Sequence, residues 1–290
     1  MLIATLAKEI HLPADQMIAL NTVALAILVI GIYVYHRVLR RVETRGGLVR
    51  TDLFVLPDLL VAGTLAFLLL AMLLLASEPP TPPAEAGPPA QEIQKPKIIE
   101  GSLVLALPVA AILALLIGRG VSLPQLFGLK QVGLVRAAGL AVGLLLVLLP
   151  FFMFVTLITQ QLLGEQADQQ PMVKIYQSAA KAGEYEIIWQ VFVAAVFIAP
   201  ITEEILFRGY FYPVLKRFIG PMPAAIATSV LFGTIHNNAL GMPGLTLLAL
   251  GLTLAYEWSG SLLVSIFMHA WFNATTLVFI WWAIQRGLLT

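Results

Sequence analysis

The sequence contains no cysteine and few charged residues. Asp, Glu, Lys and Arg together make up 11% of its 290 residues, whereas a soluble domain typically carries about 25%. The lack of cysteine excludes a disulfide framework, a thiolate nucleophile and a metal site with cysteine ligands. The net charge of +1 provides no global field that would attract nucleic acid. The scarcity of charge excludes, above all, an ordinary water-soluble fold.

The sequence is rich in long apolar runs. Hydrophobic residues make up 59% of the chain, and a helix needs about 20 apolar residues to cross a hydrocarbon core of roughly 30 Å. The runs are continuous rather than alternating, which favours helices over the strands of a membrane barrel. The sequence therefore predicts an all-α fold, a polytopic transmembrane helical bundle of about eight spans. The predicted spans are Met17 to Leu39, Leu53 to Ala76, Ser102 to Gly118, Ala137 to Leu162, Glu186 to Lys216, Met222 to Asn237, Pro243 to Trp258 and Gly260 to Trp282.

Arginines gather around the loop between the first two predicted spans. This stretch contains five arginines but only two acidic residues, Glu43 and Asp52. The positive-inside rule therefore places this loop in the cytoplasm. Both chain ends would then face outward, and we expect an integral protein of a bacterial cytoplasmic membrane. The five arginines are Arg37, Arg40, Arg41, Arg45 and Arg50.

A proline-rich segment predicts a division of the chain. Residues 77–96 contain seven prolines, a composition typical of extended, solvated chain. We expect an external linker that separates an N-terminal two-helix region, residues 1–100, from a six-helix core, residues 101–290. Within that core, residues 171–185 mix apolar and charged side chains, which indicates either a short interfacial helix or an ordered outer loop.

Ionisable side chains occur inside the later predicted spans. Each costs about 3 kcal/mol in a membrane on insertion scales, so each marks a functional-site hypothesis. The first four spans contain no comparable cluster. The set comprises Glu203, Glu204 and Arg208 in the fifth span, His236 at the end of the sixth and His269 in the eighth, where Asn273 follows.

The spacing of these residues gives each pair a geometry. Residues four apart share a helix face, so Glu204 and Arg208 are predicted to form a buried structural clamp. Glu203 is rotated by about 100° from its neighbour and needs a partner from another helix. His269 and Asn273 also share a face. All of the catalytic candidates lie roughly 14 to 22 Å along their helices from one membrane edge, and we therefore expect them to converge on one cavity.

Three motifs together resemble a known family. Glu-Glu-x-x-x-Arg at 203–208, Phe-x-x-x-His at 232–236 and His-x-x-x-Asn at 269–273 occur in that order on late membrane helices. They resemble the CPBP family of CAAX proteases and bacteriocin-processing enzymes, which includes the type II CAAX prenyl endopeptidase. The resemblance covers roughly residues 186–282.

The resemblance implies a glutamate-dependent intramembrane endopeptidase that acts on membrane-associated peptides or proteins. Glu203 and His236 would activate a water, and His269 and Asn273 would donate hydrogen bonds to the oxyanion. Glu204, Arg208 and Phe232 would support these groups. A carboxylate withdrawn from water can act as a base near neutral pH when an imidazole lies beside it.

Residue types alone leave alternatives open. Glu203, His236 and His269 form a two-His, one-Glu set that zinc hydrolases also use, although a His-Glu-x-x-His motif is missing. The family resemblance favours water activation without metal, so we expect no cofactor. A proton-coupled transporter would also need intramembrane Glu and His, but it usually shows two related halves, and none are apparent. A non-proteolytic membrane scaffold or immunity factor would carry the same motifs.

Overall fold

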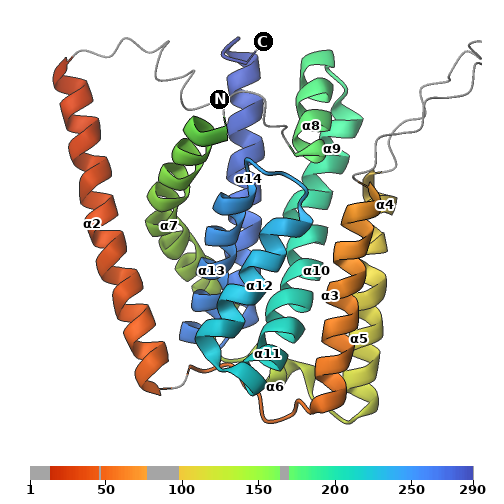
Figure 1. The fold of residues 1–290 in the computed structure, drawn as a ribbon. Coiled ribbons are helices and arrows are strands. Elements are labelled where there is room, and N and C mark those ends of the chain that lie inside the picture. Colours follow the sequence, from red (N-terminus) through yellow and green to blue (C-terminus); the bar gives the residue numbers. More distant parts are fainter. Residues whose placement is uncertain (1–13, 46, 77–97, 164–169, 290) are drawn as a thin grey trace, which may run out of the picture.

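The computed structural model describes residues 14–45, 47–76, 98–163 and 170–289, and these form helices without any strand (Figure 1). The predicted all-α fold is confirmed. The proline-rich segment 77–96 lies outside the described residues, so the expected linker and domain boundary stay predictions. The helices are α2 (Ala14–Arg45), α3 (Leu56–Ala76), α4 (Ile98–Val104), α5 (Ala106–Gly118), α6 (Leu123–Leu126), α7 (Leu134–Leu163), α8 (Pro171–Ala182), α9 (Tyr185–Val193), α10 (Ala199–Leu206), α11 (Tyr212–Ile219), α12 (Pro221–Ile235), α13 (Met242–Ser259) and α14 (Leu262–Gln285), with π-helical segments η1 (Ala194–Ile198) and η2 (Phe207–Phe211).

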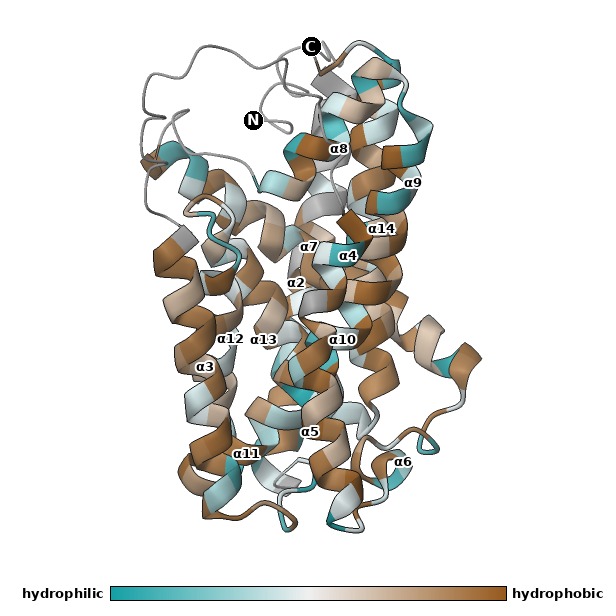
Figure 2. Cartoon of the chain, turned by 90° about the vertical axis from the view of Figure 1, so that its right-hand side faces the viewer, coloured by the Kyte–Doolittle hydropathy of each residue, from teal (hydrophilic) through white to brown (hydrophobic). Residues whose placement is uncertain are grey.

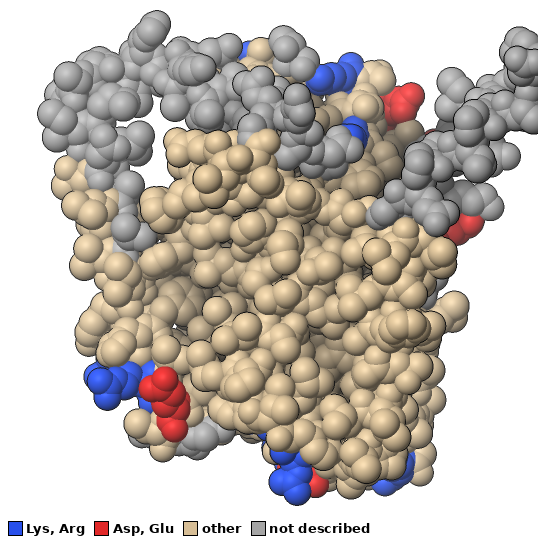
Figure 3. Space-filling model, in the orientation of Figure 1, with Lys and Arg blue, Asp and Glu red and all other residues tan. Residues whose placement is uncertain are grey.

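The outer surface of the bundle is suited to lipid. Five helical stretches of the described chain are long and apolar enough to cross a membrane: Leu56–Leu75, Ile98–Gly118, Leu134–Leu163, Tyr185–Ile219 and Leu262–Gln285. Phe67 and Leu74 on α3 are 69% and 71% exposed, and Leu107 on α5 is 70% exposed. In the view of Figure 3, the charged side chains lie toward the two ends, with a broad uncharged band between them. The outward faces of α3 and α5 are largely hydrophobic in Figure 2. These features describe an integral membrane protein.

The three other predicted spans correspond to α2, α12 and α13, and the total of eight stays a prediction. α12 has 15 residues, fewer than the roughly 20 that a perpendicular crossing requires. The turn between α12 and α13 ends well below the tops of α9 and α14 in Figure 1. His236, which follows α12 directly, is therefore placed within the height of the bundle rather than at its rim.

The segment before the fifth span is a helix rather than an ordered loop. α8 begins at Pro171, a residue suited to the first helical turn because it has no backbone N–H to satisfy. It ends at Gly183, whose φ of 72° is the left-handed conformation that favours glycine. Tyr176 and Ala179 are buried, so α8 packs one face against the protein.

α2 and α3 pack on different parts of the bundle. α2 lies against α7, where the Tyr35 hydroxyl donates to the carbonyl of Leu144 at 3.2 Å. A side chain at Gly31 would collide with the Phe151 ring, so glycine permits this close crossing. α3 lies at the opposite edge in Figure 1, and the Tyr210 hydroxyl donates to the carbonyl of Asp58 there.

A buried ion pair ties α11, α13 and the loop after α2 together at one end of the bundle. We call this end, formed by residues 47–55, α6 and the α11–α12 turn, the basic end. Glu257 Oε1 accepts from Lys216 Nζ at 2.5 Å and from the Tyr212 hydroxyl at 2.6 Å. Its Oε2 accepts from the Val49 amide at 3.2 Å. Lys216 Nζ also donates to the Val49 carbonyl at 3.0 Å. Glu257 thus has both carboxylate oxygens satisfied.

We expect Glu257→Ala to lower the free energy of unfolding by about 3 to 5 kcal/mol, because Lys216 would stay buried without its carboxylate. Thermal unfolding of the purified protein in detergent measures this. Asp52→Ala is the control, since the Asp52–Arg50 pair is exposed and should contribute less than about 1 kcal/mol. Equal loss of stability in the two variants would contradict a special role for the buried pair.

Candidate active site

The fifth span is one continuous helix, residues 185–219, with two π-helical interruptions. Each π segment ends two residues before a proline: η1 precedes Pro200 and η2 precedes Pro213. Proline has no N–H to donate, and its ring clashes with the carbonyl four residues earlier in a regular α-helix. Widening the helix just before each proline relieves both problems, and such π segments are frequent at functional sites. α10, which carries the two glutamates, lies between them.

Glu204 and Arg208 form the predicted clamp. Arg208 Nη1 donates to Glu204 Oε1 at 2.8 Å, and both side chains are almost completely buried. Arg208 Nη2 donates to the carbonyl of Ala249 on α13 at 2.9 Å. The guanidinium therefore neutralises the glutamate and at the same time fastens the fifth span to α13.

His269 on α14 joins the same carboxylate. Its Nδ1 lies 2.9 Å from Glu204 Oε1, and because a carboxylate oxygen only accepts, Nδ1 carries the hydrogen. The Nε2 atom of the ring is thereby directed elsewhere, toward Glu203 Oε2 at 3.9 Å. Glu204 thus holds Arg208 and His269 together.

His236 is fixed in the same manner by the backbone. Its Nδ1 lies 2.6 Å from the carbonyl of Phe232, one turn earlier in α12, so Nδ1 is again the donor. Its Nε2 lies 4.0 Å from Glu203 Oε2. In the neutral ring, the lone pair on Nε2 therefore faces the glutamate.

Glu203 lies between the two imidazoles. Its side chain is 14% exposed, and its Oε2 atom is buried without a hydrogen-bond partner among the described residues. Leaving a carboxylate oxygen unpaired in a buried place is costly. The arrangement is that of a site that receives a polar molecule.

Asn273, one turn beyond His269 on α14, has a backbone partner. Its Nδ2 donates to the carbonyl of Ala195 at 2.7 Å. The Ala199 N–H bonds to the Ala194 carbonyl in the π pattern, and the next donor position is Pro200, which has none. The Ala195 carbonyl is therefore left without a helical donor, and the Asn273 amide satisfies it.

Phe232 packs among the charged groups. The Arg208 guanidinium lies 4.8 Å from the centre of its ring, and the His236 and His269 rings lie 4.6 and 5.8 Å from it. A fully buried aromatic ring in this position keeps the imidazoles apart and attracts the cation through its π face.

The distances between Glu203 and the two histidines can be compared with those between the ligand atoms of a zinc site. Tetrahedral zinc with ligand distances of about 2.0 to 2.1 Å separates neighbouring donor atoms by roughly 3.3 Å. Glu203 Oε2 lies 3.9 and 4.0 Å from the two Nε2 atoms, and no group of three such side chains in the described ranges has the geometry of a metal site. The donor types suit zinc, whereas their spacing is too wide for it.

The structure brings six of the seven motif residues into contact with one another on α10, η2, α12 and α14. The seventh, Asn273, lies one turn beyond His269 and contacts Ala195. What the motifs did not reveal are the backbone carbonyls of Ala195, Phe232 and Ala249, each of which accepts from a motif side chain. Of these, only the Ala195 carbonyl has a signal in the sequence. Pro200 predicts a free carbonyl about one turn earlier, at Val196 in a regular α-helix, and the π segment shifts this position to Ala195.

A family model matches this part of the chain. Residues 185–275 match the family described as type II CAAX prenyl endopeptidase, Rce1-like. No curated protein and no solved structure matches the chain. The matched stretch contains every motif residue, and the family is one of membrane proteases, so the resemblance read from the motifs is confirmed. Residues 185–275, about a third of the chain, are thus similar to the Rce1-like family of type II CAAX prenyl endopeptidases.

Proposed function

We propose that the protein is an intramembrane endopeptidase in which Glu203 and His236 activate a water that attacks a peptide bond. One observation carries this proposal. Glu203 Oε2 is buried and has no hydrogen-bond partner in the described part of the chain, yet it faces two imidazole Nε2 atoms at 3.9 and 4.0 Å. A hydrolytic centre needs a base with a free lone pair in such a position.

The gap between Glu203 and His236 suits a single water. A separation of 4.0 Å is too long for a direct hydrogen bond, but a water about 2.8 Å from each atom can bridge it. This water would donate one hydrogen to Glu203 Oε2 and the other to His236 Nε2. Its lone pair would then be directed away from both, toward a substrate carbonyl, and Glu203 would take the proton as the new bond forms.

We assign to His269 the role of a positively charged oxyanion donor. Because its Nδ1–H is bonded to Glu204, Nε2 can donate only when the ring is protonated. Glu203 and Glu204 bring two negative charges, and Arg208 with an imidazolium at His269 would balance them. A buried charged donor of this kind stabilises an oxyanion by several kcal/mol. Asn273 Nδ2 carries a second hydrogen besides the one bonded to Ala195, and we assign it to the same oxyanion.

The substrates that we propose are membrane-associated peptides or proteins, since the site lies among membrane-spanning helices. We also propose that the basic end faces the cytoplasm of a bacterium. By the positive-inside rule, the start of α2 and the end of α14 would then lie outside.

We expect Glu203→Gln and His236→Ala each to lower the rate of cleavage by at least about 100-fold, because the first removes the base that takes the proton and the second removes an acceptor that orients the water. Comparing the membrane peptides of cells that carry the native protein with those of cells that carry Glu203→Gln identifies substrates. Purified protein then gives rates on the peptides found.

Glu186→Gln serves as the matched control, because it makes the same change on α9 of the same span outside the motifs, and it should leave cleavage unchanged. Native turnover in Glu203→Gln or His236→Ala, at native expression, would disprove the mechanism. Identical peptide profiles for all variants would indicate a scaffold or a transporter instead.

Arg208→Ala should reduce the folded protein recovered from membranes as well as its activity. Glu204 and His269 would lose their buried cation, a change that costs about 3 to 5 kcal/mol, and the Ala249 carbonyl would lose its donor. Size-exclusion chromatography after detergent extraction measures the folded yield. Native yield with unchanged melting temperature would show that the clamp does not hold the helices.

A chelator should leave the cleavage rate within about twofold of the untreated value, since the wide ligand spacing does not suit zinc. The measurement uses purified protein incubated with EDTA or 1,10-phenanthroline and then assayed with and without added zinc. Complete inhibition that zinc reverses would replace the proposed water activation with a metal mechanism at Glu203, His236 and His269.

A further inference from the structure

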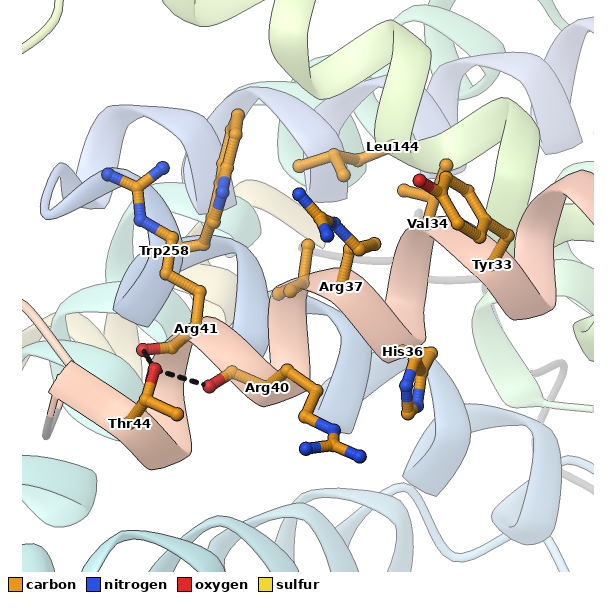
Figure 4. A pocket seen from close by; sticks show the side chains of 10 residues that line it. Tyr33, Val34, His36, Arg37, Arg40, Arg41, Thr44, Leu144 and Trp258 are labelled. Atoms are coloured by element: carbon orange, nitrogen blue, oxygen red, sulfur yellow. Dashed lines mark hydrogen bonds between the residues drawn. The ribbon is translucent and has the colours of Figure 1, made fainter.

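An open cleft lies between α2 and the rest of the bundle, away from the active site (Figure 4). Its volume is about 750 Å³, within the range of about 300 to 1,000 Å³ typical of ligand pockets. None of the seven motif residues lines it. Its walls come from the second half of α2, from Leu144 on α7 and from Trp258 at the end of α13.

The cleft follows from how α2 meets the bundle. α2 buries a narrow stripe that includes Gly31, Val38 and Val42, and the neighbouring face of the helix is left open. Tyr33, Arg37 and Arg41 follow one another at intervals of four residues along that open face, so their side chains share it. The cleft is therefore apolar at one end and basic at the other.

Two arginines and an indole form the basic part. Figure 4 shows Arg37 and Arg41 extending toward α7 and α13, with Trp258 between them and Leu144 beyond Arg37. The Arg41 guanidinium lies 5.9 Å from the centre of the Trp258 ring. Arg40 and His36 also line the cleft, and in Figure 4 they extend from the other side of α2.

These arginines have no acidic partner within the described ranges, unlike their neighbours at the basic end. Arg50 pairs with Asp52 and Arg119 pairs with Asp58, but no ion pair joins Arg37 or Arg41 to a carboxylate in that part of the chain. Like charges one helical turn apart repel each other. An anion bound beside the two arginines would reduce this repulsion.

We propose that the cleft binds an anionic phospholipid, with its phosphate at the basic part beside Arg37, Arg41 and the Trp258 indole, and its acyl chains along Tyr33, Val34 and Leu144. Basic pockets between membrane helices bind lipid head groups of this kind, and tryptophan favours the same depth at the membrane interface. A free phosphate would satisfy the arginines but would leave the apolar wall exposed. A phospholipid uses both parts of the cleft.

The test uses the purified full-length protein in a neutral detergent. Phosphatidylglycerol is titrated against phosphatidylcholine of the same chain length, and binding is followed by native mass spectrometry and by the melting temperature. The same titration is repeated with Arg37→Gln/Arg41→Gln. The control is Arg136→Gln/Arg217→Gln, which removes two exposed arginines from α7 and α11 outside the cleft.

Phosphatidylglycerol should bind the native protein and raise its melting temperature, and phosphatidylcholine should do neither. The cleft variant should bind about 30-fold more weakly, since each basic residue near a membrane surface contributes roughly fivefold in affinity. The control variant should bind as the native protein does. Equal binding by both variants would overturn the proposal. If glycerol phosphate raised the melting temperature equally, the proposal would also be overturned, because the acyl chains would then contribute nothing. Crosslinking that placed a second copy of the chain in the cleft would overturn it as well.

Discussion

A charge placed among membrane helices is costly unless the protein itself provides partners, and the Oε1 atom of Glu204 is where this constraint acts most strongly. The Oε2 atom of Glu204 has no hydrogen-bond partner among the described residues. The Oε1 atom receives Arg208 from the next turn and His269 from α14, while the same arginine reaches the backbone of α13. One buried carboxylate therefore fixes the relative position of three helices. The direction of the Glu203 side chain follows from the position of Glu204, because neighbouring residues on a helix point about 100° apart. Glu203 therefore points into the space between His236 and His269.

The prolines of the fifth span determine how its polar groups are satisfied. Pro200 and Pro213 each withdraw a backbone donor, and the helix responds with a π segment before each of them. The first segment leaves the Ala195 carbonyl without a helical partner, and Asn273 supplies one from α14. This hydrogen bond from Asn273 to Ala195 joins α14 to the fifth span at a second place, away from the Glu204–Arg208 clamp. The fifth span and α14 are thus linked twice, at Glu204 and at Ala195, with the catalytic candidates between the two links.

α13 separates two polar regions with different chemistry. Its Ala249 carbonyl belongs to the clamp, whereas Trp258 near its end lines the cleft beside α2. A lipid in that cleft would stabilise the packing of α2 without touching the residues that we assign to hydrolysis. At the basic end, Glu257 on the same helix anchors α11 and the loop that follows α2. α13 therefore takes part in three regions that share no side chain.

The sequence by itself determined the helical class, the membrane environment and the identity of the motif residues, because long apolar runs and costly intramembrane charges are local properties of the chain. It also determined the Glu204–Arg208 pair, since residues four apart on one helix must meet. The tertiary structure decided which nitrogen of each histidine faces Glu203, that Asn273 binds the Ala195 carbonyl, and that an open cleft lies beside α2. These features depend on backbone carbonyls and on the crossing of helices far apart in the sequence, and no periodicity in residue type encodes the distance between two helices.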